Sequence, residues 1–278
     1  MKKRSLLFAG VVATLFIAGA QAFAHNVWIN VENHFPKVGD TVDIVIGWGH
    51  TYPKDRLDQE MKPGNLAYIR VLAPDGAEVK PERVSETAYK LKVSKQGAYL
   101  VTAGIKKGVF TKTPKGREWS DKKGVKNPIS CTSFSIDAKS FIIAGDGDQN
   151  LQAVTGQELE VIPLSNPALL KAGGALPVKV LFRGAAAPGL TVNAAYAGFS
   201  EEESGGDIAP HKEGAMKNEK GKGRHFPVSA VTGPDGTATL VFTRAGYWIV
   251  TISHKTPYPD KDTCDEYMHN MAFTLEVR

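Results

Sequence analysis

Apolar and polar residues alternate in short runs along most of the chain, and turn residues separate these runs. An alternation with a period of two predicts half-buried β-strands, because successive side chains of a strand point to opposite faces. No window shows a convincing 3.6-residue apolar period, so we expect no long amphipathic helix. The pattern predicts strands at residues 27–31, 41–47, 67–72, 89–93, 98–104, 133–142, 158–163, 176–182, 191–196, 237–243, 247–253 and 271–277.

A polar, glycine-rich segment at residues 144–156 divides these strands into two groups of comparable plan. Many short strands with regularly spaced turns are typical of β-sandwiches. We therefore predict an all-β fold with two tandem sandwiches, Ig-like or transthyretin-like, over residues 25–150 and 151–278. Two charged segments, 105–127 and 200–225, do not fit strands and are expected to be long loops.

The first 24 residues have the pattern of a secretory signal peptide. A basic start at residues 2–4 precedes an apolar run, and small residues follow it. Small-x-small cleavage sites end at Ala20, Ala22 and Ala24, and we favour Ala24 because it lies just before the first predicted strand. The alternative is a retained membrane anchor, although the apolar run is short for a spanning helix, which needs about 20 residues. We expect the mature protein in the periplasm.

The signal peptide also accounts for much of the positive charge. The whole chain carries 34 basic and 29 acidic residues, and cleavage after Ala24 removes three basic residues and no acidic one, which lowers the formal net charge from +5 to +2. We therefore expect no nucleic-acid partner. The 105–127 segment, with eight Lys or Arg and two acids, is expected to be a solvated loop. Docking to an anionic surface such as lipid head groups is the alternative.

The chain has two cysteines, Cys131 and Cys264. An even pair in an exported protein favours a disulfide, with free thiols or metal ligands as alternatives. The chain contains no H-E-x-x-H, G-x-S-x-G, P-loop or dinucleotide-binding motif. We therefore expect that the protein is not an enzyme.

Cleavage after Ala24 would make His25 the first residue of the mature chain. The α-amine and the ring Nδ1 of an N-terminal histidine can chelate one metal ion together. His50 follows a Gly-Trp-Gly sequence at the end of a predicted strand, where scaffolds often place ligands. An amine and two or three imidazoles form a nitrogen set that suits Cu(II) or Ni(II).

A second histidine pair, His254 and His269, flanks a proline-containing loop between the last two predicted strands. We predict a metal site formed from His25, His50, His254 and His269, in which the carboxylate of Asp55 orients a ligating ring.

Several segments together resemble one family of exported bacterial proteins, the DUF4198 family, over nearly all of the mature chain. They are HNVWI, GWGHTYPKD, ISCTSFSIDAKS, ELEVIPLSNPALLKAGGALPVKVLFRG, NAAYAGFS, PDGTATLVFTRAGYWIVTISHKTPYPD and AFTLEV. Members of this family are described as periplasmic nickel-uptake components (NikK-like). The resemblance implies an exported β-protein that accompanies an inner-membrane cobalt/nickel-type transporter.

Three functions therefore compete. The first is a periplasmic protein that binds a divalent transition metal, most readily nickel, with cobalt or copper as other candidates, and passes it to the transporter. The second is a copper protein of the histidine-brace type. The third is a metal-free carbohydrate-binding or adhesion module, for which Trp48, Trp119 and Trp248 would offer stacking faces. The oligomeric state is not predicted.

Overall fold

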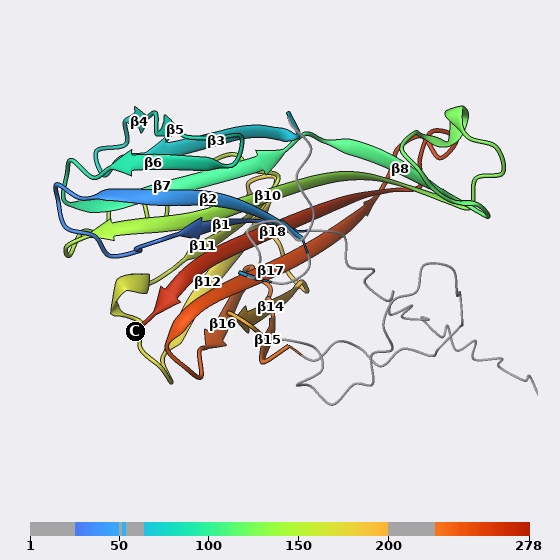
Figure 1. The fold of residues 1–278 in the computed structure, drawn as a ribbon. Helices are drawn as coiled ribbons and strands as arrows, with labels where there is room; N and C mark the ends of the chain where they lie inside the picture. The colour runs from blue at the N-terminus through green and yellow to red at the C-terminus, as the bar shows by residue number, and fades with distance from the viewer. Residues whose placement is uncertain (1–25, 50–51, 54–63, 200–225) are drawn as a thin grey trace, which may run out of the picture.

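The computed structural model describes residues 26–49, 52–53, 64–199 and 226–278 (Figure 1). Regular structure in these residues is β-strand, apart from two short 3-10 helices at Lys122–Gly124 and Pro167–Leu169. The predicted all-β class is therefore confirmed. No helix within the described ranges is long and apolar enough to cross a membrane. The predicted signal peptide, residues 1–24, lies outside them.

The strands form three sheets, which we call sheets A, B and C. Sheet A has the order β1-β2-β6-β5, with β1 at Asn26–Val31, β2 at Thr41–Gly49, β5 at Glu82–Arg83 and β6 at Ala88–Lys92. Sheet C has the order β11-β12-β13 with β16 also on β12; the bounds are β11 Leu159–Pro163, β12 Ala175–Phe182, β13 Ala185–Ala186 and β16 Thr237–Val241.

Sheet B is the largest, with ten strands. Its order is β15-β14-β17-β18-β10-β7-β3-β4, with β8 on β10 and β9 on β8. The bounds are β3 Leu66–Leu72, β4 Glu78–Val79, β7 Gly97–Ile105, β8 Gly108–Thr113, β9 Gly116–Glu118, β10 Ser130–Ala144, β14 Thr191–Tyr196, β15 Val228–Val231, β17 Gly246–Pro257 and β18 Glu266–Val277.

Sheet B connects the two halves of the chain. Its central strand β10 pairs in antiparallel fashion with β7 from the first half and in parallel with β18 from the second half. The predicted boundary segment 144–156 runs between β10 and β11, while the hydrogen-bonded sheet continues past it. The two predicted sandwiches are thus joined through a common sheet.

Sheets A and C pack on opposite faces of sheet B. Alternate residues of β10 show this arrangement, because Phe141 and Ile143 belong to the core shared with sheet C. Ile142 and Ala144 belong to the core shared with sheet A. Since successive side chains of a strand point to opposite faces, one apolar strand supplies both cores.

A buried ion pair fastens the boundary segment to sheet B. Lys139 Nζ of β10 donates to Glu160 Oε2 of β11 at 3.0 Å, and the two side chains are 1% and 2% exposed. The Glu160 carboxylate also accepts hydrogen bonds from the backbone amides of Thr155 and Gly156. This carboxylate therefore has partners on both sides, as a buried charge requires.

The prediction of a loop over residues 105–127 is wrong in part. Strands β8 and β9 form a hairpin within this segment, and β8 pairs with β10 along the edge that β7 begins. The lysine-rich composition hides the hairpin because only Val109 and Phe110 interrupt its polar residues, although Phe110, Thr111 and Thr113 are buried and β8 hydrogen-bonds to β10. The other predicted loop, 200–225, lies outside the described residues.

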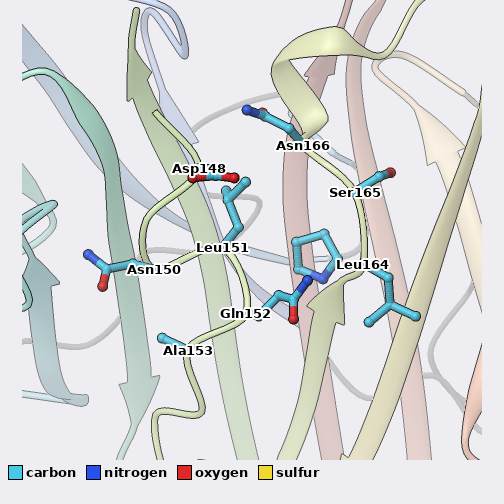
Figure 2. A pocket seen from close by; sticks show the side chains of 9 residues that line it. Asp148, Asn150, Leu151, Gln152, Ala153, Leu164, Ser165 and Asn166 are labelled. Carbon is cyan, nitrogen blue, oxygen red and sulfur yellow. The ribbon is translucent and has the colours of Figure 1, made fainter. Parts of the chain in front are cut away.

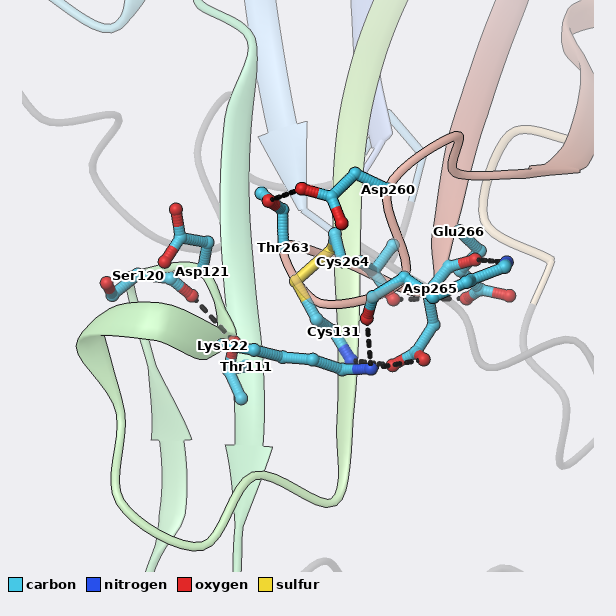
Figure 3. The surroundings of a disulfide bond; sticks show 12 residues. Thr111, Ser120, Asp121, Lys122, Cys131, Asp260, Thr263, Cys264, Asp265 and Glu266 are labelled. Atoms are coloured by element: carbon cyan, nitrogen blue, oxygen red, sulfur yellow. Dashed lines mark hydrogen bonds and ion pairs between the residues drawn. A yellow bond between two sulfur atoms is a disulfide. The ribbon is translucent and has the colours of Figure 1, made fainter.

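The predicted disulfide between Cys131 and Cys264 is confirmed. It ties the first residues of β10 to the loop that precedes β18 (Figure 3). Asp265 strengthens the same junction, because its carboxylate accepts hydrogen bonds from the Cys131 backbone amide and from Lys122 Nζ. The two strands that pair in parallel at the centre of sheet B are thus also joined covalently.

Candidate functional site

The first and last residues of the β1–β2 ladder meet at one end of sheet A. Asn26 lies directly opposite Gly49, and this pair ends the antiparallel register. The predicted ligands His25 and His50 are the chain neighbours of this pair, and both lie outside the described residues, as does Asp55.

Gly47 gives Trp28 the space it occupies. A Cβ at Gly47 would lie 2.0 Å from Nε1 and 2.4 Å from Cε2 of the Trp28 indole. Glycine at this position therefore allows the close approach of the indole from the neighbouring strand. Trp28 is buried in a cluster with Tyr52, Ala195 and Ile249, beside sheet B.

Tyr52 fixes the chain on the far side of His50. Its buried ring packs edge-on against Trp28, with ring centroids 6.0 Å apart. Its carbonyl oxygen accepts a hydrogen bond from the Gly198 backbone amide at 3.1 Å. Burial raises the pKa of its hydroxyl, so the ring stays neutral. Only His50 and Thr51 separate Tyr52 from the end of β2 at Gly49.

Asn270 lies on the face of β18 that packs against β1. Thr274 Oγ1 on this face donates to the Ile29 carbonyl at 2.6 Å, and Ala272 shares a buried cluster with Trp28. Asn270 is the next residue on the same face towards the start of β1. Its Oδ1 is buried and has no hydrogen-bond partner in the described structure. Such an oxygen is expected to have a function or an additional partner.

The other predicted ligands, His254 and His269, flank a loop as predicted, but this loop is shorter and both residues lie within strands. β17 extends to Pro257 and β18 begins at Glu266, and the two histidines are directly opposite each other in this pairing. The extension escaped prediction because residues 254–257 are polar, so the apolar alternation ends before the strand does.

Sheet C covers this histidine pair. The Phe182 ring packs edge-on against both imidazoles, with centroid distances of 4.6 Å to His254 and 5.0 Å to His269. Burial lowers the pKa of both histidines, and the nearby Arg183 lowers it further. Both rings are therefore neutral at pH 7.

His269 is 3% exposed, and neither ring nitrogen makes a hydrogen bond to any residue that the structure describes. Its Nδ1 lies 3.3 Å from Glu158 Oε2 without the alignment of a hydrogen bond. Glu158 is itself ion-paired with Lys107 and Arg183. Two cations therefore already neutralise the carboxylate that a metal ion at the histidine pair would use. Sequence reasoning missed Glu158 and Phe182 because their approach depends on how sheet C packs.

The histidine pair and the end of β1 lie on opposite faces of sheet B. His269 faces Phe182 of sheet C, whereas Ala272 and Thr274 face β1. The predicted ligands His254 and His269 therefore lie across the sheet from the end of the β1–β2 ladder, and the other predicted ligands lie outside the described residues. Within the described residues, no group of three or more His, Cys, Asp or Glu side chains is arranged to hold a metal ion.

A hydrogen-bonded network, which the sequence did not indicate, lies on the sheet C face of sheet B. Tyr68 donates to Asp137 Oδ1 at 2.8 Å, Ser135 donates to Oδ2 at 3.1 Å, and Gln157 donates to the Tyr68 oxygen at 3.0 Å. Burial raises the pKa of Asp137.

Two hollows lie away from the histidines. The first, of about 480 Å³, is lined by the segment after β10 and the turn after β11 (Figure 2). Two of its side-chain amides stabilise neighbouring backbone: the Asn150 amide donates to the Ala73 carbonyl, and the Asn166 amide oxygen accepts from the Ala168 backbone amide. The second, a groove of about 500 Å³, lies beside Tyr52 and Tyr247 on the outer face of sheet A.

The three tryptophans proposed as stacking faces differ in accessibility. Trp248 is fully buried between Tyr196 and Phe242, so it offers no face to a ligand. Trp48 is partly buried against the core of sheet A. Trp119 is 70% exposed. The structure therefore excludes one of the three residues that favoured a carbohydrate-binding module.

The family model described as a domain of unknown function, DUF4198, matches residues 22–256. No curated protein matches the chain.

Similar solved structures include the α-2-macroglobulin of Salmonella, with 13% identity and a TM-score of 0.23; the match covers 96% of this chain and 16% of the macroglobulin. The D00–D0 domain of intimin has 14% identity and a TM-score of 0.20, and the match covers 91% of this chain and 99% of the intimin chain. The Escherichia coli adhesin FdeC has 15% identity and a TM-score of 0.20, and the match covers 89% of this chain and 62% of the FdeC chain. Likenesses this weak carry no argument about function.

Proposed function

The chain belongs to the DUF4198 family, and we propose that it is an exported protein that binds a divalent transition-metal ion at the end of the β1–β2 ladder. His25, as the first residue of the mature chain, supplies its α-amine and imidazole, and His50 supplies a second imidazole. The cargo is nickel or cobalt, which the protein delivers to an inner-membrane transporter.

The pairing of Asn26 with Gly49 is the observation that supports this proposal. Opposed Cα atoms in an antiparallel pair are about 5 Å apart, and each adjacent Cα is about 3.8 Å further along the chain. Chain connectivity thus limits the Cα atoms of His25 and His50 to about 13 Å, which two histidine side chains can bridge through one ion. Tyr52 anchors the chain two residues beyond His50.

The chemistry of the donors fits the proposed cargo. An amine and imidazoles are neutral nitrogen ligands, and nitrogen sets suit Ni(II) and Cu(II) better than hard cations. These donors bind only when deprotonated, so affinity is expected to fall below about pH 6. The unpaired Oδ1 of Asn270, on the face that packs against β1, adds an acceptor for the hydrogens of the terminal amine.

The test uses mature protein that begins at His25, titrated with Ni(II), Co(II) and Cu(II) while its melting temperature and native mass are recorded. At a free metal concentration of 100 times Kd, binding should stabilise the fold by about 2.7 kcal/mol. We expect His50→Ala to abolish this shift. A protein extended by one alanine before His25, which removes the amine chelate, should bind much more weakly. His254→Ala is the matched control and should keep the shift.

The outcomes separate the competing functions. A shift with nickel or cobalt that is lost in His50→Ala supports the proposal. Tight binding of copper alone, with peroxide-dependent turnover, would instead indicate a copper enzyme. No shift with any metal, or a shift that His254→Ala abolishes and His50→Ala does not, would overturn the proposed site.

A further inference from the structure

The β8–β9 hairpin, together with the following residues 119–129, extends beyond the part of sheet B that sheets A and C cover (Figure 1). We call this part of the chain the arm. Strand β8 continues the edge that β7 begins along β10, and the disulfide and the 3-10 helix at Lys122–Gly124 brace the far end (Figure 3). The arm is therefore a stiff projection rather than a loose loop.

One face of the arm carries an aromatic platform. The Trp119 ring packs edge-on against Phe110 and Phe134, with centroid distances of 6.0 and 6.1 Å. The Arg117 guanidinium lies over the Phe110 ring at 4.4 Å. Trp119 nevertheless remains 70% exposed. The indole is thus held in place by its neighbours while most of its surface faces outward, so little side-chain entropy is lost when it is covered.

Positive charge is concentrated in the arm and in the residues just before it. The segment 105–127 carries eight Lys or Arg and two acids. Lys107, Lys122 and Lys123 are paired with Glu158, Asp265 and Asp260, respectively. The remaining five cations have no carboxylate partner in the described part of the chain; they are Lys106, Lys112, Lys115, Arg117 and Lys126.

We propose that the arm docks on an anionic lipid bilayer, with Trp119 at the level of the head groups and the unpaired cations on the lipid phosphates. Tryptophan is enriched at membrane interfaces because its ring is apolar and its N–H is polar. Basic side chains near an anionic leaflet add electrostatic attraction. This proposal rests on the arm alone and does not depend on the metal site.

The shape of the arm favours lipid over an acidic protein as the partner. A stable protein interface buries about 800 Å² on each side around a packed apolar centre. The arm instead presents one exposed indole on a narrow hairpin with lysines around it. Such a projection suits a surface that adapts to it, as head groups do.

The test is co-sedimentation of the mature protein with vesicles of phosphatidylcholine alone and of phosphatidylcholine with phosphatidylglycerol. Binding should require phosphatidylglycerol and weaken as salt is added. Each basic residue near an anionic leaflet changes partition about fivefold, or about 1 kcal/mol. Reversal of two charges in Lys112→Glu/Lys115→Glu should therefore lower partition more than tenfold. Trp119→Ser should lower it about fivefold by removing buried apolar area.

Matched controls come from the 3-10 helix at Pro167–Leu169. Leu169 is 78% exposed and Lys171, two residues beyond it, is exposed, so Leu169→Ser removes an exposed apolar side chain and Lys171→Glu reverses an exposed charge away from the arm. They should leave partition unchanged. Equal binding to both vesicle types, no binding, or equal losses in arm and control variants would overturn the proposal. If the protein binds immobilised polyglutamate but not vesicles, and the arm variants lose this binding, the partner would be an acidic protein and the lipid proposal would be overturned.

Discussion

His269 of β18 lies directly opposite His254 of β17, and the Phe182 ring packs against both imidazoles. In this position His269 is buried, with two ring nitrogens that make no hydrogen bond. An unsatisfied buried polar group costs about 1–3 kcal/mol, whereas an apolar side chain of similar shape avoids this cost.

Replacement of His269 by leucine should therefore raise the free energy of unfolding by about 1 kcal/mol at pH 7. His269→Ala should lower it by about 2 kcal/mol, because alanine leaves a cavity beside Phe182. Urea denaturation of the two variants and of the wild type measures both effects. A leucine variant that is destabilised as much as the alanine variant would mean that the ring nitrogens have a partner.

The buried pair of Lys139 and Glu160 gives a second prediction. Lys139→Met removes the counter-charge of a carboxylate that is 2% exposed, and this should cost about 3–5 kcal/mol. Adding Glu160→Gln removes the buried charge and should recover at least half of that loss. Arg70, in an exposed pair with Glu78, is the control, because Arg70→Met should cost less than about 1 kcal/mol.

Thermal unfolding of these three variants and of the wild type at neutral pH compares their stabilities. If Lys139→Met is no more destabilising than Arg70→Met, the buried carboxylate does not need its ammonium partner.

His34 predicts a pH dependence of stability. It is buried, and Nδ1 donates to the Phe141 carbonyl at 2.8 Å, while Nε2 has no partner among the described residues. Burial lowers its pKa to about 4 from an ordinary value of 6.5. Between these two values the unfolded chain binds the proton and the folded chain does not, so stability falls as pH falls.

The stabilisation should be fully present above about pH 6.5 and be lost by about pH 4, a change of about 3 kcal/mol. His34→Gln, whose amide can also donate to Phe141, should show a correspondingly flatter curve in urea denaturation across this range. His254 and His269 contribute slopes of the same sign in both proteins, so the difference isolates His34. Parallel curves would contradict the assignment.

Gly47 gives the fourth prediction. Gly47→Ala would drive its Cβ into the Trp28 indole, which is enclosed by Tyr52 and Ile249. Overpacking of this kind costs about 1–3 kcal/mol. Near-UV circular dichroism and urea denaturation should show a displaced tryptophan and reduced stability. Gly233→Ala is the control, because its nearest neighbour would be 3.4 Å away. Equal stability of the two variants would show that the indole can move freely.

The alternation of apolar and polar residues predicted the strands of this fold where one face is buried, and each predicted strand is present. It failed where strands leave the core. Residues 254–257 and most of the β8–β9 hairpin are polar and show no apolar alternation, so their strands become evident only from the backbone pairing. The parallel pairing of β10 with β18 joins residues more than 130 positions apart and has no local indication in the sequence.

In the candidate site too, the sequence indicated local features but not the contacts that depend on sheet packing. The Gly-Trp-Gly sequence marked the end of a strand, but the approach of the Trp28 ring to Gly47 depends on the β1–β2 pairing. The separation of His269 from the end of β1 depends on which face of β18 each residue occupies, and this follows from sheet packing rather than from spacing. The exposed position of Trp119 likewise depends on a hairpin that its lysines concealed.

The parallel pairing at the centre of sheet B also sets an order of events during synthesis. Strand β18 follows every other strand that the structure describes, yet it fills the place between β10 and β17. Until residues 266–277 emerge, both neighbours present open edges with unpaired amides and carbonyls, which can pair with another chain. The sheet therefore cannot close before these residues are available. A chain that lacks residues 266–277 would be prone to aggregate.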